Sequence, residues 1–91
     1  MALHEYSVWF RNKEADPSDQ DYEWVASFIV DAPSAPDAKR WGDELSRSYA
    51  SRNSTNEYRS SEAFPISNPK SAAELPVVEY GVTVSDQHIG W

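Results

Sequence analysis

The sequence predicts a two-layer α+β sandwich of β-β-α-β-β order, in which a four-stranded, mainly antiparallel sheet carries one long helix on one face. Two observations predict this fold. Residues 34–53 place apolar side chains at helical spacing, whereas the segments before and after them place apolar side chains at alternate positions. We expect the 91 residues to form one domain, 1–91, because a chain of this length holds a single core.

Residues 3–31 are predicted to form a β-hairpin around a polar, acidic loop at 12–21. A register that pairs Phe10 with Trp24, Val8 with Ala26, and Tyr6 with Phe28 makes one face of the hairpin apolar and aromatic, so that this face can receive the helix. The same register directs three large apolar side chains to the sheet face away from the helix, which we call the outer face: Trp9, Val25 and Ile29.

Residues 34–53 are predicted to form the helix. Ser34 and Asp37 have capping-box spacing, and Arg52 and Asn53 suit the C-terminal end. The apolar stripe is Ala38, Trp41, Leu45 and Tyr49, and the expected ion pairs on the other side are Arg40–Glu44 and Asp43–Arg47. Gly42 lies at the edge of the stripe, which indicates that a bulky group packs against the helix backbone there.

Two further strands are expected after the helix, at 57–66 and 77–84, followed by a tail at 85–91. In the third strand Tyr58, Phe64 and Ile66 share one parity. A right-handed crossover through the helix predicts the strand order 2-1-3-4. The tail has no periodicity, but Ile89 and Trp91 predict that it docks on the domain.

Composition limits the classes of function. The chain has 15 acidic and 8 basic residues and a net charge of −7, which argues against binding to nucleic acid or to an anionic membrane and permits a basic protein partner. No secretory signal and no membrane-length apolar segment is evident. The chain has no cysteine, which excludes disulfides and thiolate metal sites and fits a reducing compartment, so we expect a cytoplasmic protein.

The sequence contains no recognisable catalytic or metal-binding motif. The acidic loop lacks the central glycine and flanking helices of a calcium-binding EF-hand. No serine lies in a nucleophile motif and no glycine-rich phosphate loop is present. We therefore predict no catalytic residue, metal or cofactor. One alternative stays open, a small enzyme or ligand-binding domain with a site at a dimer interface that uses His4, Glu5, Asp86 or His88.

Aromatic residues exceed what one helix on one sheet face needs, since twelve are present and four are tryptophan. Exposed apolar surface marks interfaces, where tryptophan is enriched. The predicted interaction residues are Trp9, Val25, Ile29, Val77 and Trp91, and the acidic residues expected to steer a partner are Glu14, Asp16, Asp19, Asp21 and Glu23.

The sequence thus favours a non-enzymatic interaction module that binds a basic protein partner, or itself as a homodimer, through the outer face. Small acidic inhibitors, including immunity and anti-defence proteins, have a similar composition. Two further alternatives stay open: the tail 85–91 could cover the outer face, or the domain could have a purely structural role in a larger assembly.

Overall fold

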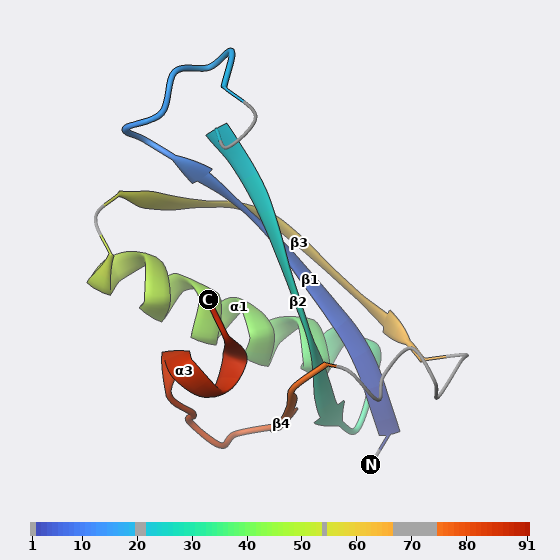
Figure 1. Ribbon diagram of the computed structural model, residues 1–91. Coiled ribbons are helices and arrows are strands. Elements are labelled where there is room, and N and C mark those ends of the chain that lie inside the picture. Colours follow the sequence, from blue (N-terminus) through green and yellow to red (C-terminus); the bar gives the residue numbers. More distant parts are fainter. Residues whose placement is uncertain (1, 20–21, 54, 67–74) are drawn as a thin grey trace.

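The computed structural model describes residues 2–19, 22–53, 55–66 and 75–91. The elements in chain order are β1 (Ala2–Asn12), β2 (Glu23–Ala32), α1 (Ala35–Arg52), β3 (Asn56–Pro65), β4 (Val77–Glu79) and α3 (Asp86–Ile89). Figure 1 shows α1 crossing one side of the sheet, with α3 and the C-terminus on that same side. The chain is therefore an α+β domain, as predicted.

The hairpin register is the predicted one. β1 and β2 are antiparallel, with Phe10 opposite Trp24, Val8 opposite Ala26, and Tyr6 opposite Phe28. This register gathers apolar side chains on the face that α1 covers, and the core there consists of Tyr6, Val8, Phe10, Phe28, Val30, Ala32, Ala38, Leu45, Tyr49, Val78 and Ile89. The aromatic alternation of the two strands thus determines which face is buried.

Helix α1 also begins and ends where the sequence predicts. Ser34 is the N-cap and accepts a hydrogen bond from the backbone N–H of Asp37, and Asn53 is the C-cap. The predicted ion pairs are wrong. Lys39 pairs with Asp43, and Arg40 reaches back to Asp37, at 2.9 and 3.2 Å. Arg40 thus pairs with Asp37 in the first turn of the helix and not with the exposed Glu44. Asp43 lies on the side of α1 that faces the sheet, where Lys39 reaches it.

The sheet has the strand order β3-β1-β2-β4. The third strand lies beside the first, as predicted, but the fourth does not lie beside the third. β4 instead pairs with β2 and is parallel to it, so the sheet is mixed. The predicted strand 77–84 is also too long, because the chain turns at Gly81, whose φ is +81°, and Val82 is 45% exposed.

A bulge in β3 places two aromatic side chains differently from the prediction. Trp9 pairs with Ser60 and Phe10 pairs with Tyr58, which leaves Arg59 as an extra residue between them. Tyr58 therefore faces α1, whereas Phe64 lies on the outer face. The expectation that Tyr58 and Phe64 share a face is wrong, because one unpaired residue inverts the alternation.

The C-terminal tail docks on the domain, but on the side of α1. Trp91 stacks on Tyr49 with ring centroids 4.7 Å apart, and it meets Phe10 and Phe28 edge-on, each at 5.6 Å. The tail thus does not cover Trp9. In the described part of the chain, no helix is both long enough and apolar enough to cross a membrane.

Candidate functional site

The outer face is built from alternate residues of β1 and their partners in the neighbouring strands. Its side chains form cross-strand rows, each centred on one residue of β1. The members from β1 and β2 are Leu3, Glu5, Ser7, Trp9, Arg11, Glu23, Val25, Ser27, Ile29 and Asp31, and those from the edge strands are Glu57, Arg59, Ser60, Glu62, Phe64, Val77 and Glu79.

Apolar side chains on this face remain accessible to solvent. Five large hydrophobic residues are exposed in the described ranges, and four of them lie here: Leu3, Val25, Phe64 and Val77, at 43–54%. Half-buried Trp9 lies directly beside Val25. An accessible apolar surface on one face of a small sheet is a feature of interaction sites.

The structure brings together three of the five predicted interaction residues. Trp9, Val25 and Val77 share the outer face. Ile29 also lies there but is fully buried, so it cannot contact a partner directly. Trp91 lies on the other side of the sheet, where its half-buried ring stacks on Tyr49.

Sequence reasoning missed two exposed residues of the outer face. Leu3 has the same parity as Trp9, so the alternation of β1 contains the signal for it. Phe64 reaches this face only because of the bulge at Arg59. The run of four polar residues at 59–62 interrupts the alternation of the strand and was the available sign of such an irregularity.

The charges of the outer face are mostly negative. Arg11 pairs with Glu57, and its hydrogen bond lowers the pKa of that carboxyl. Arg59 lies 3.8 Å from Glu23. The other carboxylates of the face have no cationic partner within the described residues: Glu5, Asp31, Glu62 and Glu79. Uncompensated negative charge therefore lies among and beside the exposed apolar residues, since Glu5 pairs with both Ile29 and Phe64.

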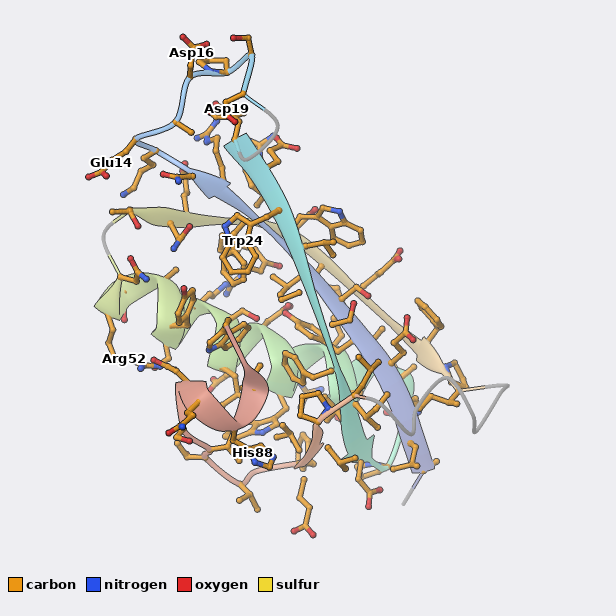
Figure 2. All side chains as sticks on the ribbon, viewed as in Figure 1. Glu14, Asp16, Asp19, Trp24, Arg52 and His88 are labelled. Carbon is orange, nitrogen blue, oxygen red and sulfur yellow. The ribbon has the colours of Figure 1, made fainter. Side chains whose placement is uncertain are left out.

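The described part of the acidic loop projects beyond the end of the sheet. Figure 2 shows Glu14, Asp16 and Asp19 there, away from α1. Asp16 accepts hydrogen bonds from the N–H and hydroxyl of Ser18 at 2.9 and 2.8 Å, and these bonds lower its pKa. Asp21 lies outside the described residues. Among the described residues, no group of three histidines or carboxylates is placed to hold a metal ion.

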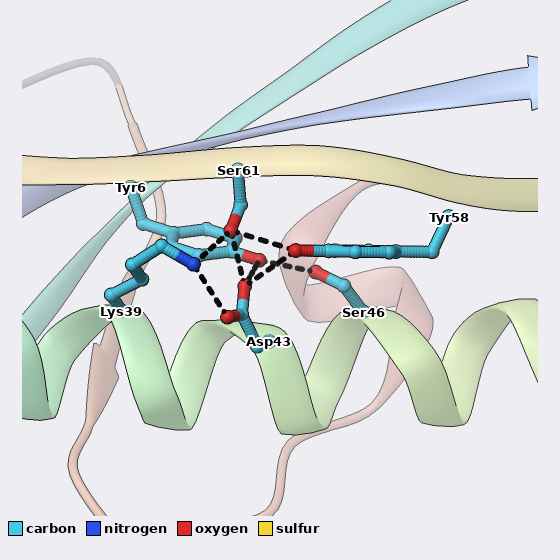
Figure 3. Close-up of polar contacts among 6 residues, drawn as sticks. All are labelled: Tyr6, Lys39, Asp43, Ser46, Tyr58 and Ser61. Carbon is cyan, nitrogen blue, oxygen red and sulfur yellow. Dashed lines mark hydrogen bonds and ion pairs between the residues drawn. The ribbon is translucent and has the colours of Figure 1, made fainter.

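A polar cluster joins α1 to the sheet and is the densest hydrogen-bonding group in the described parts of the structure (Figure 3). The Asp43 carboxylate is at its centre and accepts hydrogen bonds from the Tyr6 hydroxyl at 2.7 Å, from the Ser61 hydroxyl, and from Lys39 Nζ at 2.9 Å. Ser46, which is fully buried, contacts the Tyr6 hydroxyl at 3.0 Å. Tyr58 completes the cluster through Ser61 at 3.0 Å.

The protonation states of this cluster favour a structural role. Burial alone would raise the pKa of Asp43, but the hydrogen bonds from Ser61, Lys39 and Tyr6 together lower it. The Asp43 carboxylate raises the pKa of Lys39. Neither group is thus tuned to exchange a proton near neutral pH. We interpret the cluster as a clamp that fixes the position of α1 on the sheet.

The residues of the alternative site lie on two different elements, His4 and Glu5 on β1 and Asp86 and His88 on α3. Alternation along β1 directs His4 and Glu5 to opposite faces, and His4 is only 3% exposed. Asp86 binds Arg52 at 2.6 Å, and His88 Nε2 lies 3.0 Å from the carbonyl oxygen of Val77. Figure 2 shows Arg52 and His88 at the α3 end of the molecule.

Comparison of the chain with protein-family models, with curated proteins and with solved structures gives no match. Function must therefore be inferred from the residues themselves. The outer face is the candidate site, because its apolar residues are exposed, whereas the side chains of the polar cluster bond to one another and Trp91 packs against the aromatic core.

Proposed function

We propose that this protein is an interaction module that binds a partner protein with a basic surface through the outer face. One observation carries the proposal: exposed apolar side chains at Leu3, Val25, Phe64 and Val77 share a face with carboxylates that have no cationic partner among the described residues. Protein interfaces combine apolar contacts with polar and charged ones in this way.

The charge of the face favours a basic partner over a second copy of the chain. The described residues of the outer face include six carboxylates and two guanidinium groups. Two such faces brought together would place like charges against one another, which is unfavourable at an interface. A partner with lysine or arginine side chains placed between apolar ones would instead compensate the carboxylates of Glu5, Glu62 and Glu79.

The acidic loop supports the same proposal through the rate of association. Glu14, Asp16 and Asp19 extend the negative charge beyond the end of the sheet (Figure 2). Exposed charge of this kind accelerates encounter with an oppositely charged partner more than it tightens the final complex. Such properties suit a small acidic inhibitor that covers a basic site on its target.

The test is capture of a partner from a lysate of the source cells by three immobilised forms of the full chain. Val25→Glu places a carboxylate in the exposed apolar surface, and Val82→Glu is the matched control, because Val82 is 45% exposed but lies outside the sheet. We expect the wild type and Val82→Glu to retain the same basic protein, and Val25→Glu to lose it. Raised salt should slow its association.

Two results would contradict the proposal. One is equal capture by Val25→Glu and Val82→Glu, which would place the binding surface elsewhere. The other is a homodimer, detected by light scattering, that Val25→Glu converts into folded monomers. That result would assign the outer face to self-association.

A further inference from the structure

A hollow of about 330 Å³ lies on the outer face beside Trp9. Its other walls are formed by Glu23 and by residues of the bulged strand β3: Arg59, Ser60, Ser61 and Glu62. This volume is at the lower end of the range for ligand pockets, roughly 300–1,000 Å³, and the hollow is open to solvent. It has room for one long side chain of a partner.

The walls of the hollow favour a cation. Glu62 has no cationic partner in the described part of the chain, whereas Arg59 already lies near Glu23. The hollow has two carboxylates and one guanidinium group in its walls. Because Arg59 lies near Glu23, the carboxylate of Glu62 remains for an incoming cation. Negative charge thus exceeds positive charge at the point where a partner side chain would enter.

The Trp9 ring adds a second attraction. Two cations lie over aromatic rings in the described residues, Arg11 over Tyr22 and Arg47 over Tyr58. No such contact is formed there at Trp9. Tryptophan is the best aromatic acceptor for a cation, and a planar guanidinium can stack on the ring while it forms a forked hydrogen bond to a carboxylate. An ammonium group is a compact point charge and cannot form the planar stack with the forked hydrogen bond.

We infer that the hollow receives an arginine side chain of the basic partner, stacked on Trp9 and bound to Glu62. This inference rests on the proposed function and specifies the chemistry that the partner must present. It makes the Trp9 hollow the point of strongest contact on the outer face, since arginine and tryptophan are both enriched at interface hot spots.

The test uses a small probe, so that the partner need not be known. The full ¹⁵N-labelled chain is titrated with N-acetyl-arginine amide, and the Trp9 indole signal, identified with a Trp9→Phe variant, is followed by NMR. The citrulline analogue is the neutral control, since it has the same shape without the charge. We expect the Trp9 signal to shift with the arginine probe and to shift little with citrulline.

Two carboxylate variants locate the binding site. Glu62→Gln should weaken arginine binding roughly threefold, the size expected for an exposed ion pair. Glu44→Gln, an exposed change on α1 that removes the same charge, should leave binding unchanged. No shift at Trp9, an equal shift with citrulline, or an equal loss in both variants would overturn the inference. If the arginine probe failed but Val25→Glu still abolished partner capture, the proposed function would stand and only the inference about the Trp9 hollow would fall.

Discussion

The ring of Tyr6 lies directly against the backbone of Gly42. A Cβ atom at Gly42 would lie 2.7 Å from Tyr6 Cγ and closer still to two other ring carbons. The ring cannot move aside easily, because its hydroxyl is held by Asp43 and Ser46. This contact confirms the close packing that the sequence predicts at Gly42, and it explains a glycine in the middle of a helix.

Replacement of this glycine should therefore destabilise the protein. Alanine is the better helix former by about 1 kcal/mol, yet Gly42→Ala should lower the free energy of unfolding by about 1–3 kcal/mol because the core is overpacked. Urea denaturation followed by tryptophan fluorescence measures the change. Ser48→Ala, at an exposed position of α1, is the control and should change stability by less than about 0.5 kcal/mol. A Gly42→Ala variant more stable than the wild type would show that Tyr6 does not pack there.

The Asp43 clamp should make stability depend on pH below about 4, the ordinary pKa of an unfolded aspartate. The hydrogen bonds to Asp43 lower its pKa in the folded state despite partial burial. The unfolded chain thus binds more protons in this range, and stability falls as the pH falls toward the folded-state pKa. Unfolding free energies at pH 5 and pH 3 should differ less in Asp43→Asn than in the wild type.

Asp43→Asn should also cost about 1–2 kcal/mol at neutral pH, because the hydrogen bonds from the Tyr6 and Ser61 hydroxyls become neutral ones and Lys39 loses its ion pair. Glu44→Gln is the neighbouring control, since Glu44 is exposed and its side chain has no hydrogen bond to another described residue. An identical pH dependence in wild type and Asp43→Asn would mean that the clamp does not hold the carboxylate charged.

Trp91 should contribute to stability despite its position at the end of the sequence. It closes an aromatic group with Phe10, Phe28 and Tyr49. Trp91→Ala should lower the unfolding free energy by about 2–4 kcal/mol, somewhat less than for a fully buried tryptophan. Urea denaturation followed by far-UV circular dichroism measures this loss, and near-UV circular dichroism should show reduced aromatic order. Val82→Ala, at an exposed site, should cost less than about 0.5 kcal/mol. Equal costs for the two variants would contradict the docked tail.

Neighbouring valines in β4 test its placement against β2. Val78 is 1% exposed and pairs with Val30, whereas Val77 is 47% exposed and pairs with Ile29. Val78→Ala should cost about 2 kcal/mol and Val77→Ala clearly less, as measured by thermal or urea unfolding. The reverse ranking would mean that β4 presents its other side to the core.

The hairpin and α1 could be predicted because their information is local. Alternating aromatic residues define the buried face of β1 and β2, and the cap residues Ser34 and Asn53 mark the ends of the helix. Both depend on neighbouring residues alone. The predicted register, down to the pairing of Phe10 with Trp24, is confirmed for this reason.

The position of β4 could not be predicted, because alternation indicates which face a strand buries and not which strand it joins. Val78 is buried as its pattern indicates, but the short strand pairs with β2 at the edge opposite β3. Beyond it, the valines continue to alternate while the chain has already turned at Gly81.

The candidate site was predicted in part for the same reason. The alternation of the strands placed Trp9, Val25 and Val77 on the outer face correctly. The side of the sheet on which Phe64 lies depends on the bulge at Arg59, and the position of Trp91 depends on a tail whose sequence has no periodicity. The burial of Ile29 depends on its neighbours in space. The burial of Ile29 and the docking of Trp91 have no local signature in the sequence, and the polar run at 59–62 is the one local sign of the bulge.

The extra residue in β3 has a consequence for solubility. β3 lies at an open edge of the sheet, where unpaired backbone groups could template the addition of strands from other molecules and lead to fibre growth. The irregularity at Arg59 bends this edge, and charged side chains at Arg59 and Glu62 flank the bend. The kink that directs Phe64 outward is thus also the kind of irregularity that hinders edge-to-edge aggregation.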